Sequence, residues 1–280
     1  MRDERLISCA DFGDQGDVAV LHCHGGPGSR LEPGWISESA NAAGLRLIGI
    51  SRPGYGGSTV RPGRTIADSA HDAIAVADQL GIEQFFVTGS STGGSYALAI
   101  ASIAPKRVLG VVICCGMSDM RIAVHDAMMD VAAANWRASD REAATLIATE
   151  QFGETGEKVI DHFGPIFSPG DIAFVSDPAF LANDPNNESF QQGVYGYVDD
   201  RIADSPAQGW SSFDVENVNC PILIIHGEQD LVVPLAHAHH TARLVRGAEL
   251  RTYAEHGHLT INMEVVSALT ELVGSRQDDA

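Results

Sequence analysis

The chain has 280 residues, 44% of them hydrophobic and 20% charged, a balance typical of a folded globular domain with a sizeable core. Its formal net charge is −19, from 37 acidic against 18 basic side chains. A field of that sign repels phosphate backbones and anionic lipids, so we expect neither a nucleic acid nor a membrane as a partner.

The N-terminal residues 1–8 contain no apolar run long enough for a signal peptide, and no segment approaches membrane-spanning length. The five cysteines, an odd number, are Cys9, Cys23, Cys114, Cys115 and Cys220. None has C-x-x-C or zinc-like spacing, and most lie in or beside apolar runs, where cysteine behaves as a small hydrophobic residue. We therefore expect a cytoplasmic protein with buried thiols and no disulfides.

Apolar strands alternate with amphipathic helices over the first 116 residues. We expect strands within 5–23 and over 45–50, 84–88 and 107–115, and helices over 35–43, 66–80 and about 93–104. Thr65 is placed to cap the second helix, and Gly81 to end it. Near-continuous apolar strands between such helices predict a parallel sheet that is covered on both faces.

A turn of small residues follows the strand at 84–88. Gly89-Ser90-Ser91-Thr92-Gly93 fits G-x-S-x-G, a strand-to-helix turn that holds a serine in a strained, exposed position. Ser91 is the predicted nucleophile, because a pattern centred on Ser90 would need glycine at positions 88 and 92. A plain Gly/Ser-rich loop would look the same in isolation, so the interpretation depends on the rest of the site.

A second glycine-rich loop, His24-Gly25-Gly26-Pro27-Gly28, follows the apolar run at 18–21. Such a loop exposes backbone N–H groups, which are the donors that a tetrahedral oxyanion requires. A simple β-turn before a helix explains these residues equally well, so the loop alone leaves both interpretations open.

The pattern changes at about residue 117. Residues 117–209 are richer in Met, Asp and Asn and predict helices over 120–135 and 139–151, with no strand alternating between helices. We expect this stretch to form an inserted, mostly helical cap over the sheet edge, between two parts of one core at 1–116 and 210–280. In the second part, strands are expected at 221–225 and 249–253 and helices at 235–246 and 259–273.

Two residues fit the acid and the base that a serine nucleophile needs. Asp230 follows the buried strand at 221–225, and His258 follows the strand at 249–253. Because the carboxyl ends of parallel strands share one edge of a sheet, we expect both side chains to lie near the turn with Ser91. The chain order Ser, Asp, His is the order of the α/β-hydrolase fold.

The sequence resembles the α/β-hydrolase family over nearly the whole core, 18–116 and 215–273. The motifs that carry the resemblance are His24–Arg30, Arg52–Ser58, Gly89–Gly94, Ile225–Asp230 and Gly257-His258. The resemblance implies an α/β-hydrolase fold with a mostly parallel central sheet flanked by helices. It also implies Ser91, Asp230 and His258 as the catalytic triad, and the backbone N–H groups of Gly26 and Thr92 as the oxyanion hole. No cofactor and no metal are expected.

The chain also departs from the family's pattern. Ser90 stands where relatives often have a bulkier residue, and Ser51 where they often have an acidic one. Serine at position 91, where the dehalogenase and epoxide-hydrolase branches have aspartate, argues against those branches, because no alkyl-enzyme ester can then form in their manner.

Several residues compete with these assignments. His256 is a rival base, and Glu228 and Asp119 are rival acids; the family's Gly-His pair favours His258, and geometry decides the acid. The group His237, His239 and His240 resembles a metal cluster, although a solvated face is the simpler interpretation. We expect structural roles for His22, His24 and the tryptophans, which are Trp35, Trp136 and Trp210.

The H-G-G-P-G loop resembles that of proline iminopeptidases, which bind a free amino terminus with acidic cap residues. Five acidic residues could do so here, but solvated side chains are the simpler interpretation: Glu154, Glu157, Glu188, Asp199 and Asp200. That branch also typically reads G-G-S-W-G at the nucleophile. We therefore expect hydrolysis of a small-molecule carboxylic ester or lactone. The alternatives are an aminopeptidase, a C–C bond hydrolase and a non-catalytic ligand receptor, and the oligomeric state is left open.

Overall fold

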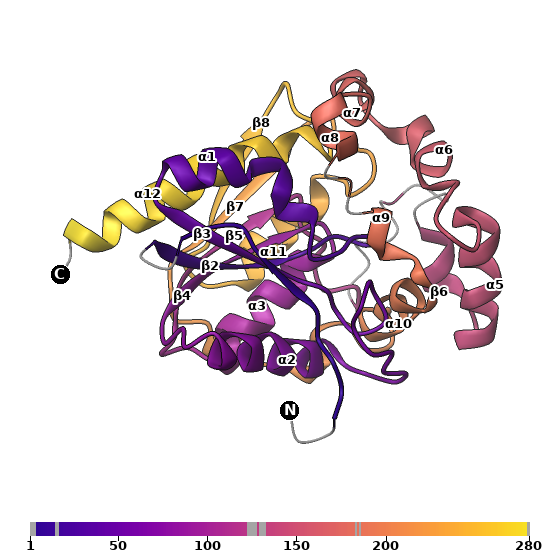
Figure 1. Ribbon diagram of the computed structural model, residues 1–280, viewed down its shortest axis with the longest axis horizontal. Coiled ribbons are helices and arrows are strands. Elements are labelled where there is room, and N and C mark those ends of the chain that lie inside the picture. The colour runs from indigo at the N-terminus through magenta and orange to yellow at the C-terminus, as the bar shows by residue number, and fades with distance from the viewer. Residues whose placement is uncertain are drawn as a thin grey trace.

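A seven-stranded sheet forms the centre of the structure, a computed structural model that describes residues 4–14, 17–121, 128, 133–182, 184 and 186–278 (Figure 1). The strand order is β1-β3-β2-β4-β5-β7-β8. The strands are β1 Cys9–Asp11, β2 Val18–Cys23, β3 Leu45–Ile50, β4 Phe85–Ser90, β5 Val108–Cys114, β7 Ile222–Gly227 and β8 Glu249–Tyr253. Only β1 pairs antiparallel with its neighbour in this sheet, so the predicted mostly parallel sheet is confirmed.

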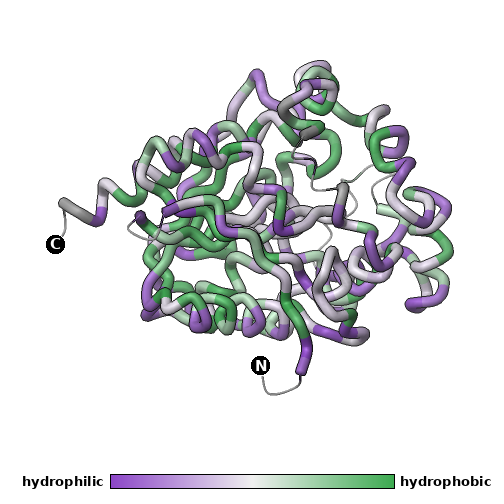
Figure 2. The backbone as a smooth tube through the Cα atoms, in the orientation of Figure 1, coloured by the Kyte–Doolittle hydropathy of each residue, from purple (hydrophilic) through white to green (hydrophobic). Residues whose placement is uncertain are grey.

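Alternate strand residues belong to opposite layers of the core. In β7, Ile222 and Ile224 join one hydrophobic cluster, while Leu223 and Ile225 join the other. The first layer contains residues of α2 (Ile66–Gln79), α3 (Gly93–Ile103) and α11 (Ala236–Leu244), and the second contains residues of α1 (Ser37–Ala42) and α12 (Val265–Asp278). Figure 2 shows hydrophobic residues concentrated along the strands between these helices. Helices therefore cover both faces of the sheet, as predicted.

Local capping determines where some of these helices begin. The side chain of Thr65 accepts the N–H of Asp68, whose carboxylate accepts the N–H of Thr65, so the predicted cap of α2 is confirmed as a capping box. Two predicted helices are each divided in the structure. The 3-10 helix η1 (Glu32–Ile36) precedes α1, and the 3-10 helix η7 (Thr260–Glu264) precedes α12.

Short helices between β5 and β7 gather at one end of the sheet (Figure 1). They are η3 Ala134–Arg137, α5 Arg141–Phe152, α6 Val159–Phe163, η4 Gly164–Ile166, α7 Pro169–Val175, α8 Pro178–Ala182, α9 Asn186–Ser189 and α10 Tyr195–Ala203. Two 3-10 helices that follow, η5 Gly209–Ser212 and η6 Val215–Asn217, lie beside α2 and α3 instead. The predicted helix 139–151 corresponds to α5. The predicted helix 120–135 lies largely outside the described residues. A short strand, β6 (Gln191–Val194), corrects the prediction of no strand here, although it does not join the sheet.

Several of these helices, namely η3, α5, α6, η4 and α10, contribute to a separate hydrophobic cluster that is rich in aromatic residues. The ring of Phe152 on α5 lies 5.7 Å from that of Phe190 and 4.8 Å from that of Tyr197 on α10. We propose that this region is the cap of a two-part core. Within the described ranges, no helix is both long and apolar enough to cross a membrane.

Candidate active site

The turn between β4 and α3 holds Ser91 in a left-handed backbone conformation, with φ of +53°. Its N–H donates to the carbonyl of Cys114, and its own carbonyl accepts from Met117. A Cβ on Gly89 would overlap the backbone of Gly93, and one on Gly93 would overlap the carbonyl of Cys23. Both glycines of the motif are therefore required by close backbone contacts, and the strained residue between them is the predicted nucleophile.

The predicted base and acid are in contact. His258 Nδ1 lies 2.7 Å from Asp230 Oδ2, and the other oxygen of Asp230 accepts the N–H groups of Val232 and Val233, each at 2.9 Å. Burial alone would lower the pKa of His258, but the carboxylate of Asp230 outweighs it and raises that pKa well above 6.5. His258 and Ser91 line the same cavity. The three residues, from separate loops, thus lie at the carboxyl edge of the sheet.

The rival residues have other partners. Glu228 accepts from the hydroxyl of Thr252, and His256 Nε2 lies 3.4 Å from Glu264. The carboxylate of Asp119 binds the Arg121 guanidinium at 2.6 Å and accepts the N–H of Trp210. Among these candidates, Asp230 and His258 are the acid and base that the structure brings together.

The glycine-rich loop lies against the turn with Ser91. A Cβ on Gly26 would lie 3.2 Å from Thr92 Oγ1, and both residues line a cavity with Ser91. Glu32 accepts the N–H of Gly25 at 2.9 Å. The loop is thereby fixed beside the start of α3. The free backbone N–H groups at the start of a helix are suited to bind negative charge.

Arg52 holds the same loop from the other side. Its Nη1 donates to the carbonyl of His24, and its Nη2 donates to the carbonyl of Gly25 at 2.8 Å. His24 Nε2 accepts the backbone N–H of Arg52 at 3.1 Å, so the predicted structural role of His24 is confirmed. The sequence motifs contained both residues but gave no sign of this contact.

Asp171, near the start of α7, contacts the loop that carries His258. Its carboxylate accepts the backbone N–H groups of His258, Leu259 and Thr260, each at 2.9 Å. Sequence reasoning missed this residue. The pattern Ser168-x-x-Asp171 indicates only a capping box, which the structure also contains, and no local signal joins it to a loop 87 residues away.

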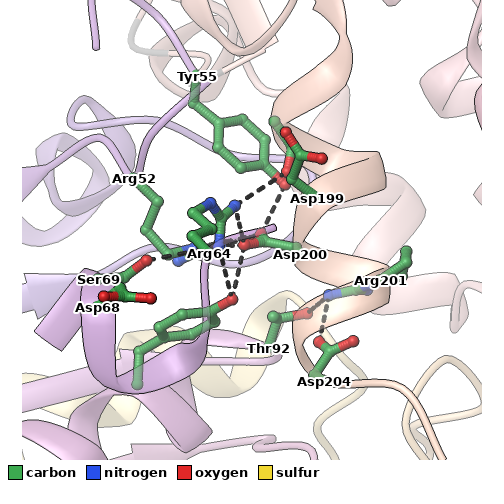
Figure 3. A network of polar contacts seen from close by, with 12 residues as sticks. Arg52, Tyr55, Arg64, Asp68, Ser69, Thr92, Asp199, Asp200, Arg201 and Asp204 are labelled. Carbon is green, nitrogen blue, oxygen red and sulfur yellow. Dashed lines mark hydrogen bonds and ion pairs between the residues drawn. The ribbon is translucent and has the colours of Figure 1, made fainter. Parts of the chain in front are cut away.

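A buried network of charges joins α10 to the sheet region (Figure 3). The carboxylate of Asp200 binds the guanidinium groups of Arg52 and Arg64 at 2.7 and 2.6 Å and accepts the hydroxyls of Tyr55 and Tyr96, both at 2.7 Å. Burial raises the pKa of Asp200, but the two guanidinium groups hold it well below its usual range. The side chain is therefore an ionised anchor in the interior.

The acidic residues of the helical region correct one expectation. Asp199 and Asp200 are buried rather than solvated, and Asp199 binds Arg141 at 2.7 Å. Glu188 binds Arg30 at 2.8 Å, and Glu157 accepts from the hydroxyl of Thr155. Asp199, Asp200 and Glu188 are thus paired within the protein, whereas Glu154 and Glu157 are exposed, as predicted.

An apolar cavity opens beside Ser91 and His258. Its walls include Trp35, Phe163, Phe167 and Phe180. Trp35 therefore borders the site, contrary to the expectation that all three tryptophans serve packing alone. Trp210 is packed as predicted, and its Nε1 donates to Ser95 at 2.9 Å. Trp136 Nε1 donates to Asp204 at 2.7 Å, but its ring also lines a smaller cavity beside Ser91.

The histidine group at 237–240 is partly structural. His237 and His240 are buried, which corrects the expectation of a solvated face, and their Nδ1 atoms contact Ser118 at 3.2 and 2.8 Å. Within the described part of the chain, one group has metal-ligand spacing, and it consists of Cys115 with Asp230 and His258. It coincides with the acid and base above. All five cysteines are free thiols.

Comparison with known proteins identifies the class. The sequence profile of the alpha/beta hydrolase fold matches residues 18–261, so the chain belongs to this family, and it is a hydrolase. The uncharacterized hydrolase YcgS of Bacillus subtilis is 25% identical, covering 86% of this chain and 84% of that protein. A non-heme haloperoxidase of Rhodococcus erythropolis is 27% identical, covering 80% of each chain. The structure of a hydrolase from Pseudomonas aeruginosa PA01 superposes with a TM-score of 0.71 at 21% identity, covering 98% of this chain and 95% of that one. The predicted fold and enzyme class are confirmed.

Proposed function

We propose that the enzyme hydrolyses a small-molecule carboxylic ester or lactone through an acyl-enzyme on Ser91, with His258 as base and Asp230 as its partner. The observation that carries the proposal is the 2.7 Å contact between His258 and Asp230 at a cavity that also contains the strained Ser91. This arrangement matches the roles of a nucleophile, a base and an orienting acid.

The chemistry proceeds in two halves. Ser91 Oγ attacks the ester carbonyl while His258 takes its proton, and the N–H groups of Gly26 and Thr92 stabilise the oxyanion. The C–O bond to the alcohol then breaks, and His258 returns the proton to the alcohol oxygen. Water next attacks the acyl-enzyme with His258 again as base, which releases the acid and restores Ser91. No step needs a cofactor.

The carboxylates of the helical region favour an ester over an amino-terminal peptide. An aminopeptidase would need free carboxylates to bind a protonated amine, whereas Glu188, Asp199 and Asp200 are each paired with arginine. The cavity beside His258 is walled by aromatic and aliphatic side chains, which suit an uncharged leaving group.

The test is hydrolysis of 4-nitrophenyl esters of increasing acyl length by the wild type and by Ser91→Ala. We expect Ser91→Ala to lose roughly 10⁴-fold or more of kcat, because the nucleophile is gone. Ser90→Ala is the matched control: the Ser90 hydroxyl donates to Asn262 at 2.7 Å, away from the proposed proton transfer, so a loss below about tenfold is expected. Folding is checked by circular dichroism. Equal loss in both variants, or no turnover by the wild type, would refute the proposal.

A further inference from the structure

A second, smaller cavity is also lined by Ser91. It shares Gly26, Ser91 and Phe163 with the apolar cavity, but its far wall includes Trp136, Tyr197 and Arg201. His258 is among the residues around the apolar cavity and not among those around this one. The guanidinium of Arg201 therefore lines the same small, mostly apolar cavity as Ser91.

The guanidinium of Arg201 is fixed beside the oxyanion loop. Its Nη2 donates to Thr92 Oγ1 at 2.8 Å and to Asp204 at 2.7 Å, as Figure 3 shows. The same group lies over the rings of Trp136 and Tyr197, with its central carbon 4.2 and 4.9 Å from the ring centres. A Cβ placed on Gly26 would be 3.5 Å from Nη2 and 3.6 Å from Nη1, so this edge of the guanidinium faces the proposed oxyanion hole.

Arg201 also has unused binding capacity. The side chain is 2% exposed, and its Nε atom is buried without a hydrogen-bond partner among the described residues. A buried donor that is left unpaired is costly, and a water, an ion or a ligand group bound at the site would satisfy it.

The buried network has more positive than negative charge. Its guanidinium groups are those of Arg52, Arg64 and Arg201, and its carboxylates are those of Asp200 and Asp204, all at most 5% exposed. Asp199 is paired separately with the partly exposed Arg141, and Glu32 binds His22 and the N–H of Gly25. Arg201 is paired with Asp204, whereas Arg52 and Arg64 share Asp200, so the network as a whole carries one positive charge that a bound anion would balance.

The position of His258 decides which part of the substrate reaches Arg201. Because the imidazolium donates its proton to the leaving alcohol, the alcohol portion belongs in the apolar cavity that His258 lines. The acyl chain must then extend past the oxyanion hole into the smaller cavity. We propose that Arg201 binds a free carboxylate on the acyl portion of the substrate. The substrates are then half-esters of short dicarboxylic acids, or lactones whose acyl portion carries a free carboxylate. This inference rests on the proposed function.

The first experiment compares two 4-nitrophenyl esters that differ only in charge: the half-ester of glutaric acid and its carboxamide counterpart, the ester of glutaramic acid. Water adds its hydroxyl to the acyl carbon of either ester and a proton to the nitrophenolate, so the reaction is the same. We expect kcat/KM to favour the carboxylate by roughly ten- to a hundredfold, the range for a charge-assisted hydrogen bond in a buried site.

The second experiment removes the guanidinium. Arg201→Met alone would leave Asp204 unpaired, so the double variant Arg201→Met/Asp204→Asn accompanies it. In whichever of these two variants folds, we expect the ratio of kcat/KM for the carboxylate ester to that for the carboxamide ester to fall to about one, whatever the absolute rate. Arg141→Met is the matched control, since it removes a nearby arginine charge from outside the cavity and should keep the preference.

The outcomes separate this inference from the proposed function. If 4-nitrophenyl butyrate is hydrolysed but the wild type does not prefer the carboxylate, the carboxylate site is refuted and the esterase stands. If no ester is turned over, the esterase proposal fails, and calorimetric binding of glutarate against glutaramate decides the carboxylate site alone. Tighter binding of glutarate that depends on Arg201 supports the site, and equal binding overturns it.

Discussion

The sheet and the helical region after β5 are held together by different forces. The sheet layers bury aliphatic side chains in two clusters, with Ile224 in one and Leu47 and Ile225 in the other. The helical region has an aromatic cluster around Phe152, and it reaches the sheet region partly through a buried ion network centred on Asp200. Burial of apolar area is spread over many residues, whereas an ion network depends on each of its members. The helical region is thus the part that a single substitution can loosen.

The largest effect is expected for Asp200→Asn. The substitution leaves Arg52 and Arg64 without a buried counter-charge, so we expect the free energy of unfolding to fall by about 3–5 kcal/mol in urea denaturation. Asp199→Asn is the matched control on the same helix. Its partner Arg141 is partly exposed, so a loss of about 1 kcal/mol is expected. Equal losses in the two variants would show that the Asp200 network contributes no more to stability than the Asp199–Arg141 pair.

Phe152→Ala tests the aromatic cluster. The ring is fully buried against several others, and its removal should destabilise by about 3–5 kcal/mol. Leu146→Ala, on an exposed position of the same helix, should change stability by less than about 0.5 kcal/mol. If the helical region unfolds separately, Phe152→Ala will give two transitions, with tryptophan fluorescence lost before the far-ultraviolet signal. A single coincident transition would show that both regions unfold together.

Asp171→Asn tests the link from α7 to the loop with His258. Asparagine keeps the size of the side chain but has one acceptor oxygen and no charge, so the loop loses part of its support. We expect kcat to fall roughly ten- to a hundredfold with little change in KM, and the kinetic pKa of His258 to fall. Ser168→Ala removes the cap of α7 but leaves these contacts, so stability should fall by about 1 kcal/mol and kcat should be nearly kept. A drop in stability alone for both variants would refute a positioning role.

The smallest effect, on pH dependence, follows from the raised pKa of His258. The base must be neutral, so kcat/KM should rise with pH through a midpoint above 6.5. The free energy of unfolding should instead decrease as the pH rises. The Asp230–His258 pair contributes fully below pH 6.5, the ordinary value in the unfolded chain, and loses its contribution as pH rises through the folded-state pKa. Asp230→Asn should shift the kinetic midpoint downward, and a wild-type midpoint below 6.5 would contradict the assignment.

The two regions also differ in how far the sequence predicts them. Continuous apolar runs and capping residues such as Thr65 are local signals, so the strands and α2 were placed within a few residues. The elbow around Ser91 was recognisable because its glycines meet backbone that is close in space. Asp171 and Arg201 gave no such signal. Their roles arise from contacts with residues 87 and 109 positions away, which depend on how short, weakly periodic helices settle on the sheet.

The adjacency of Asp200 and Arg201 on α10 has a consequence for how the enzyme can diversify. The anchor fixes the position of the arginine from the sheet side, while Phe167 and Phe180, which line the apolar cavity and not the smaller one, come from other segments. Substitutions in those segments can reshape the space for the alcohol without displacing Arg201. Directed evolution for new leaving groups should therefore begin at these two phenylalanines and leave α10 unchanged.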